Sequence, residues 1–108
     1  MSSSLSPLER TLIELVASEN WRGFRADSLV VTRRENTGAG RYVYIEDKRD
    51  QKLPDGTYAA QGRLLEMAGV PSGLAFMVDV SRERINYLEI AVYGDEGWDG
   101  VERQWRIA

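Results

Sequence analysis

Hydrophobic residues recur at helical spacing near the start of the chain. They are Leu8, Leu12, Leu15 and Val16. Residues three and four positions apart lie on one face of a helix, so this spacing predicts an amphipathic helix. The Ser6 side chain can accept a hydrogen bond from the amide of Glu9, the third helical residue, and the Glu9 side chain can accept one from the amide of Ser6. Pro7 suits the first helical position. We predict a helix from Pro7 to Ser18 or Glu19.

Beyond this helix, the period of the hydrophobic positions changes to two, which is typical of β-strands. The predicted strands are 28–34, 41–46, 62–67, 74–80 and 85–93, with a short last strand possible at 104–107. Residues 59–67 also fit a short helix, but we favour the strand. The charged segment 47–57 is predicted to be a loop, and the glycine-containing segment 68–73 a turn.

Short links between successive strands imply an antiparallel sheet. The four-residue link after residue 80 indicates a hairpin of the two longest hydrophobic strands. The apolar stripe of the helix can cover one face of this sheet. Residues 1–108 are therefore predicted to form a single α+β domain of two layers, with the N-terminal helix packed on an antiparallel sheet of about five strands. A hydrophobic fraction of 43% and a charged fraction of 29% agree with a globular protein.

The amino-acid composition excludes most of the side chains that enzymes use for catalysis. The chain has no cysteine and no histidine, which excludes thiolate nucleophiles, serine–histidine triads, and thiolate or imidazole metal sites. No feature selects a catalytic pair among the 17 acidic residues, and the glycine segments lack the spacing of a phosphate loop. We predict no enzyme activity, no catalytic residue, no metal and no cofactor. An enzyme that uses carboxylates, serine, tyrosine or arginine alone is the alternative.

Negative charge is concentrated late in the chain. Between residues 85 and 102 there is no Lys or Arg, whereas the net charge of the whole chain is only −3. Such segregation steers oppositely charged partners, and tryptophan is common among interface hot spots. The predicted partner-binding residues are Tyr93, Asp95, Glu96, Trp98, Asp99 and Glu102. Two alternatives are that Trp98 folds back onto the core, and that the acids bind Ca²⁺, although their spacing does not match a calcium loop.

The outward side of the hairpin is a second candidate surface. Its residues are Met77, Tyr87 and Glu89, with Ala75, Ala91 and Tyr93 beside them. Tyrosine and methionine are favoured in protein interfaces. Coverage by segment 47–61 and a homodimer contact are equally compatible with this pattern.

Nucleic acid and membrane are not predicted as partners. Basic residues gather between residues 33 and 52 around Tyr42 and Tyr44, which suggests RNA binding, but acidic residues are interleaved among them. A negative net charge also disfavours phosphate binding. No apolar run approaches the ~18 residues that span a bilayer. Residues 1–4 lack the features of a secretory signal, so we predict a cytoplasmic protein.

Residues 62–93 resemble a family of short bacterial α+β proteins of unknown function. The matching motifs are Gly69-Val70-Pro71, Val78-Asp79 and Leu88-Glu89-Ile90. Small acidic proteins of this build are similar to immunity proteins of bacterial toxin systems. The resemblance implies a protein, monomeric or dimeric, that binds a cognate and basic, nuclease-type toxin and neutralises it by occlusion. The alternative is a small homo-oligomeric structural or ligand-binding domain without catalytic activity.

Overall fold

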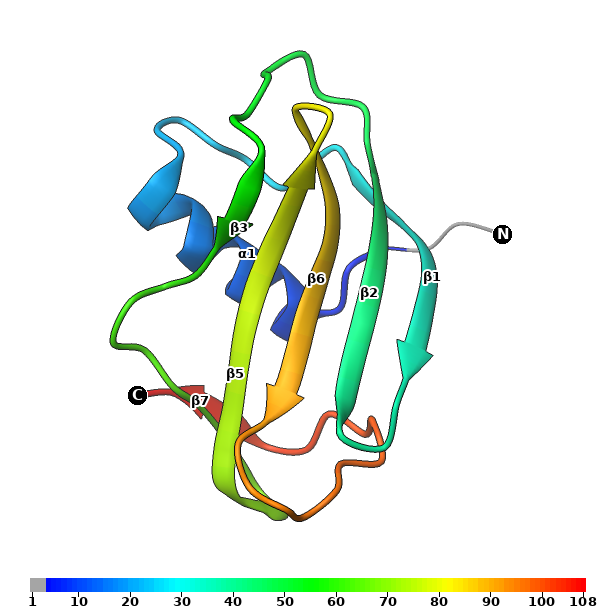
Figure 1. The fold of residues 1–108 in the computed structure, drawn as a ribbon, viewed down its shortest axis with the longest axis vertical. Helices are drawn as coiled ribbons and strands as arrows, with labels where there is room; N and C mark the ends of the chain where they lie inside the picture. Colours follow the sequence, from blue (N-terminus) through cyan, green and yellow to red (C-terminus); the bar gives the residue numbers. More distant parts are fainter. Residues whose placement is uncertain (1–3) are drawn as a thin grey trace.

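The computed structural model describes residues 4–108, which form one helix and seven strands (Figure 1). Residues 1–3, part of the segment from which the lack of a secretory signal is predicted, lie outside it. In chain order the elements are α1 (Pro7–Asn20), β1 (Leu29–Asn36), β2 (Gly40–Asp47), β3 (Gly56–Tyr58), β4 (Leu65–Met67), β5 (Val70–Ser81), β6 (Arg84–Val92) and β7 (Trp105–Ile107). All strand pairs are antiparallel, in the order β1-β2-β6-β5-β4-β7, and β3 also pairs with β5. The α+β class is confirmed, and the sheet has more strands than the five predicted.

Helix α1 begins with the predicted cap. The hydroxyl of Ser6 accepts from the amide of Glu9 at 3.1 Å, and the amide of Ser6 donates to the Glu9 carboxylate at 2.8 Å. The cap satisfies two amide groups that have no partner inside the helix. The helix buries the apolar residues Leu8, Leu12, Ile13, Val16 and Ala17. Its start and its buried side are thus set by local sequence.

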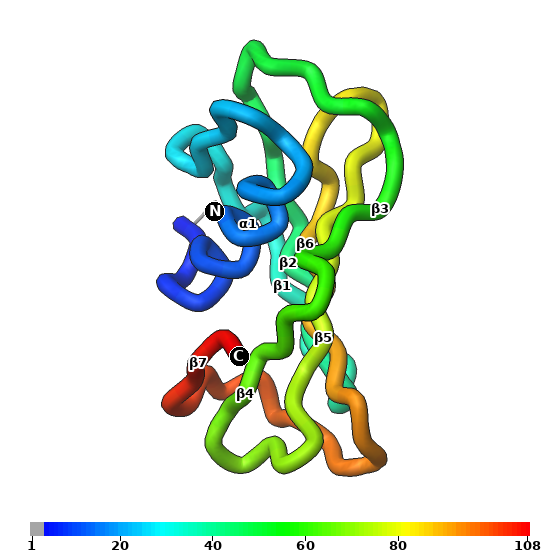
Figure 2. Tube along the Cα trace, turned by 90° about the vertical axis from the view of Figure 1, so that its left-hand side faces the viewer, coloured from blue at the N-terminus to red at the C-terminus, as the bar shows by residue number. Residues whose placement is uncertain are grey.

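Alternate residues of the central strands face α1. They include Val43 of β2, Leu88 and Ile90 of β6, and Leu74 and Val78 of β5, all fully buried in one hydrophobic cluster with the helix. Figure 2 shows α1 and β7 on the same side of the sheet, with the strands curling around the helix. Among residues 4–108, no element covers the opposite side of β2, β6 and β5.

Three local expectations need correction. Segment 47–57 is not all loop, because β2 ends only at Asp47 and β3 begins at Gly56, which pairs with Val80 of the long strand β5. The turn predicted at 68–73 is shorter, since Gly69 adopts a φ of +85° and β5 begins at the next residue. The helix alternative for residues 59–67 is wrong, because residues 65–67 pair with β5 and with β7 as strand β4.

The β5–β6 hairpin closes through two residues instead of the predicted four. Arg82 and Glu83 have φ values of 54° and 65°, which match the twist of a two-residue hairpin turn but disfavour side chains. The preceding loop holds this turn in place. Asp55 accepts from the amide of Glu83 at 2.8 Å, and the amide of the buried Leu53 donates to the Glu83 carbonyl at 3.1 Å.

Candidate functional site

The acidic segment, residues 94–102, is tied to the body of the protein through Trp98. The Trp98 side chain is only 2% exposed. Its indole nitrogen donates to the carbonyl of Val101 at 2.9 Å, and the guanidinium of Arg41 lies 4.9 Å from the ring centroid. The amide of Trp98 also donates to the carbonyl of Gly38 in the β1–β2 turn at 2.9 Å. The alternative considered from sequence, an indole folded onto the core, is therefore confirmed, and little of the Trp98 side chain is left at the surface for a partner.

Arg41 joins this segment to the start of α1. One of its terminal nitrogens donates to Glu9 at 3.0 Å and to Glu102 at 2.6 Å, and the other donates to the carbonyl of Gly100. Glu9 is fully buried and also binds Arg34 at 2.6 and 2.7 Å. Burial raises the pKa of Glu9, but the bonds from Arg34 and from the Ser6 amide, with the charges of Arg34 and Arg41, outweigh it and lower the pKa overall. Glu102 is thus part of an internal charge network.

Two other acids of this segment also have internal partners. Asp99 receives two bonds from Arg103, at 2.7 and 2.8 Å, and these hold the pKa of Asp99 well below its usual range. Glu96 accepts from the amide of Ser72 at 3.0 Å. Of the six residues predicted here, only Tyr93 and Asp95 have side chains that bond to no residue among 4–108. No set of three carboxylates in these described residues is arranged to hold a metal ion.

The uncovered side of β2, β6 and β5 offers a different arrangement. We call it the open face and define it by the outward side chains Tyr42, Tyr44, Met77, Asp79, Tyr87 and Glu89. Figure 1 looks onto this side of the sheet, with α1 behind the strands. Because successive side chains of a strand point to opposite faces, these residues alternate with the buried ones that contact α1. All six are half-buried.

Three tyrosines of the open face contact one another. The rings of Tyr42 and Tyr44 stack at 6.1 Å, and the Tyr87 ring meets them at 5.5 and 6.0 Å. The pairing of β2 with β6 sets this contact by placing Tyr44 opposite Tyr87. Arg33 of β1 covers the Tyr44 ring at 4.4 Å. Each such ring pair contributes about 0.5–1.5 kcal/mol beyond burial, so the cluster is a fixed aromatic surface.

Two carboxylates of the open face lack a cationic partner. Asp79 accepts from the hydroxyl of Ser81 at 2.9 Å and from the amide of Asn86 at 3.2 Å. Glu89 is hydrogen-bonded to Tyr42. Within residues 4–108 neither carboxylate forms an ion pair. Among the residues that the structure describes, the centre of the open face therefore carries two carboxylates outside any ion pair.

The neighbouring tyrosines respond to this charge. The charge of Glu89, and then its hydrogen bond, raise the pKa of Tyr42 above its usual value. Burial, followed by the charges of Asp79 and Glu89, raises the pKa of Tyr87. A nearby negative charge disfavours a phenolate, so the carboxylates contribute to both shifts, first for Tyr42 and after burial for Tyr87.

A hollow of about 380 Å³ adjoins the open face. Its floor is formed where Ala75 of β5 lies opposite Ala91 of β6, because two methyl side chains leave space between larger neighbours. Met77, Glu89 and Tyr93 line its sides, and segment 59–63 forms the rim.

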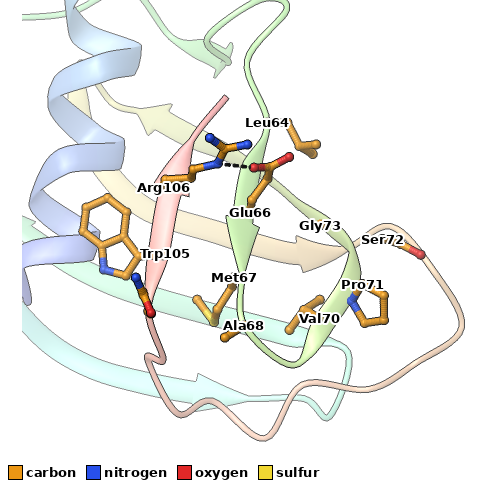
Figure 3. Close-up of a pocket in the computed structure, with 11 residues that line it drawn as sticks. Leu64, Glu66, Met67, Ala68, Val70, Pro71, Ser72, Gly73, Trp105 and Arg106 are labelled. Carbon is orange, nitrogen blue, oxygen red and sulfur yellow. Dashed lines mark hydrogen bonds and ion pairs between the residues drawn. The ribbon is translucent and has the colours of Figure 1, made fainter.

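A second groove, of about 390 Å³, lies at the edge of the sheet formed by β4, β5 and β7. Figure 3 shows Glu66 and Arg106 joined by an ion pair across it, with Met67, Val70 and Pro71 nearby. The two charged residues of this groove thus neutralise each other. It offers neither an unmatched charge nor a group suited to catalysis, so the open face is the better candidate site.

The secondary surface residues Met77, Tyr87 and Glu89 lie together on the open face. Coverage by segment 47–61, an alternative considered from sequence, is wrong for the centre of this face, because all three side chains stay partly exposed. Tyr42 and Tyr44 were not predicted here. Their alternation with Val43 and Ile45 indicated a shared face, but only the pairing of β2 with β6 places them beside Tyr87.

Comparisons with protein-family models, curated proteins and solved structures find no match to this chain. Within residues 4–108, the single helix is too short and too polar to cross a bilayer.

Proposed function

We propose that this chain is a non-catalytic, cytoplasmic protein-binding domain that uses its open face to occlude a basic region of a partner protein. The role is the one that the resemblance to immunity proteins implies, with a bacterial toxin as the partner. One observation carries the proposal. The open face combines a fixed tyrosine cluster with two carboxylates, Asp79 and Glu89, that form no ion pair within residues 4–108.

The aromatic part of the face suits a protein partner. Tyrosine and methionine are enriched in protein interfaces, and aromatic residues supply most hot spots. Ring contacts fix Tyr42, Tyr44 and Tyr87 before binding, so little side-chain entropy is lost on association.

The charge of the face favours a basic partner. Asp79 and Glu89 gain most from a protein that brings Lys or Arg to them, because within residues 4–108 their only partners are neutral groups. The same charge repels phosphates, which disfavours a nucleic acid at this site.

A homodimer through this face is less favourable. A two-fold contact places the same patch of both subunits together, so the carboxylates of Asp79 and Glu89 would approach their own copies. Like charges placed together in an interface cost several kcal/mol. Sedimentation equilibrium over a range of concentrations tests this point, and we expect a monomer. A dimer that dissociates on the Tyr87→Ala substitution would replace our proposal with self-association.

The direct test uses the protein encoded beside this chain, with binding measured by calorimetry and inhibition by the activity of that protein. We expect Tyr87→Ala to weaken binding by at least about tenfold, as truncation of an aromatic hot spot does. Glu14→Gln is the control, because Glu14 lies on the exposed side of α1, away from the open face. Equal binding of the wild-type protein and Tyr87→Ala, with both folded by circular dichroism, would contradict the proposal.

A further inference from the structure

The hollow beside the open face has a floor suited to an unbranched side chain. Ala75 and Ala91 form the floor, and the thioether of Met77 and the ring of Tyr93 line the sides. Its volume of about 380 Å³ lies in the range of sites that enclose small ligands or single side chains. The Tyr93 ring is 63% exposed, so its face is available to an incoming group.

A main-chain carbonyl also faces the hollow. The amide of Tyr93 donates to the carbonyl of Gly73 at 3.1 Å, which fixes the alternation of hydrogen bonds between β5 and β6. By this alternation Phe76 directs its N–H and C=O away from β6, toward segment 59–63. On that side of β5, Val78 pairs with β3 and Leu74 with β4, but no strand of residues 4–108 pairs with Phe76 there, since its partner Ile90 lies on the other side, in β6. One acceptor and one donor of the backbone are thus left at the wall of the hollow.

Charge decides which group fits this hollow. Glu89 lines it and has no ion pair within the described chain, so its carboxylate can accept a cation. Among the described residues that line the hollow, the one cation is Arg63, which lies on the exposed rim and whose Nε is held outside the floor by a bond to the carbonyl of Ala108 at 3.1 Å. An anion entering the hollow would meet the charge of Glu89.

We propose that this hollow receives an arginine side chain of the basic partner. The carboxylate of Glu89 and the carbonyl of Phe76 accept hydrogen bonds from the guanidinium, the ring of Tyr93 stacks on its plane, and its methylenes pack on Ala75 and Ala91. Arginine fits better than lysine because it presents five donors in one plane and stacks on aromatic rings. This inference deepens the proposed function and rests on it for the identity of the partner.

The test uses a peptide probe and does not need the partner. A ¹⁵N-labelled sample of the full chain is titrated with acetyl-Gly-Arg-Gly-amide, and the amide shifts are followed by NMR. We expect saturable changes confined to residues 59–63, 75–77 and 89–93. The same peptide with citrulline, which keeps the shape but loses the charge, should bind at least about tenfold more weakly, because hydrogen bonds to charged groups are the stronger ones.

Variants of the hollow separate its possible occupants. Glu89→Gln keeps the shape of the side chain and should lower the affinity for the arginine peptide by about tenfold. Arg63→Gln should leave this affinity unchanged or raise it. Ala91→Leu fills the hollow and should abolish binding, and Glu14→Gln on α1 is the matched control. Equal binding of the citrulline peptide, no effect of Glu89→Gln, or loss of binding only in Arg63→Gln would overturn the proposal.

The two proposals fail in different ways. If the arginine peptide does not bind but the partner protein still requires Tyr87, the arginine hollow is wrong and the open face stands. If the peptide binds as expected while the co-encoded protein ignores the open face, the proposed partner is wrong and the arginine site stands.

Discussion

The acidic segment and the open face both place carboxylates beside aromatic rings, but they differ in what those carboxylates contact. In the acidic segment, Glu102 pairs with Arg41, Asp99 with Arg103, and Trp98 is buried under Arg41. On the open face, Asp79 and Glu89 meet only neutral donors within residues 4–108. The first arrangement stabilises the fold, and the second leaves charge available to a partner.

The difference shows that local charge density does not predict availability for binding. The acidic segment has no cation of its own up to residue 102, yet its partners come from β2 and from the residue that follows it. A buried or bonded carboxylate has already exchanged its hydration for protein contacts, so it gains little from a new cation. What matters is the balance of charges after folding.

The largest effect that separates the two regions is expected from Trp98→Ala. Removing a buried indole creates a cavity and should lower the free energy of unfolding by about 3–5 kcal/mol. Tyr93→Ala, one residue before this segment and 63% exposed, is the control and should change it by less than about 0.5 kcal/mol. Urea unfolding measures both. If Trp98→Ala changed the free energy of unfolding only slightly, the indole would not be part of the core, and Trp98 would again be a candidate for contact with a partner.

The internal charge network should make the protein sensitive to acid. Glu9 has a lowered pKa in the folded state, so the stability it contributes is complete above its ordinary value of 4.5 and is lost as the pH falls through the folded value. Asp47, held by Arg49 at 2.7 Å, adds to the loss in the same direction. We expect the free energy of unfolding to fall steeply below about pH 4.5.

Glu9→Gln tests this network directly. At pH 7 it should cost about 3 kcal/mol, since Arg34 and Arg41 would lose the carboxylate that they share. Below pH 4.5 the difference between the variant and the wild type should shrink, because the carboxyl of the unfolded wild type becomes protonated, and it should be smallest below the folded pKa, where the carboxyl of the folded protein is protonated as well. A constant difference from pH 7 to pH 3 would show that Glu9 does not titrate with unfolding.

A matched pair of double variants compares the two regions in binding. Asp79→Asn with Glu89→Gln removes two charges from the open face, and Asp95→Asn with Asp99→Asn removes two from the acidic segment. We expect the first pair to lower the affinity for the co-encoded partner by at least about tenfold at low salt, and the second pair to lower it by less than about threefold. Calorimetry at two salt concentrations measures this, and the reverse order would favour the acidic segment as the binding surface.

Much of the fold could be predicted from local sequence. Ser6, Pro7 and Glu9 specify the start of α1, and the alternating residues of β2, β5 and β6 place the strands within a few residues. Strand β3 was missed because its three residues, Gly56 to Tyr58, form a strand only through pairing with β5. Pairing between distant segments is not encoded in a local period.

The candidate site was predicted only in part, for the same reason. Met77, Tyr87 and Glu89 share one hairpin, so their common face follows from alternation alone. Tyr42 reaches them through the pairing of β2 with β6. The burial of Trp98 stayed one of two alternatives because its contacts, with Gly38 and Arg41, lie far away in the sequence.

The smallest expected effect is a change in the pKa of Tyr42, which reports the charge at the centre of the open face. Its pKa is raised first by the charge of Glu89 and then by the hydrogen bond to it, so Glu89→Gln should lower that pKa toward 10.0. Asp79→Asn should instead lower the pKa of Tyr87 and leave Tyr42 unchanged, because Asp79 contributes only to Tyr87. NMR titration of the tyrosine ring carbons resolves each residue, with Glu14→Gln as the control.

The same signal reports binding. A cation docked against Glu89 offsets the negative charge that disfavours the Tyr42 phenolate, so an arginine peptide or a basic partner should also lower the pKa of Tyr42. In Glu89→Gln the ligand should have little further effect, because the charge it would offset is already gone. A Tyr42 pKa that does not respond to Glu89→Gln would mean that the Glu89 charge is already compensated, and the contrast between the two regions would then disappear.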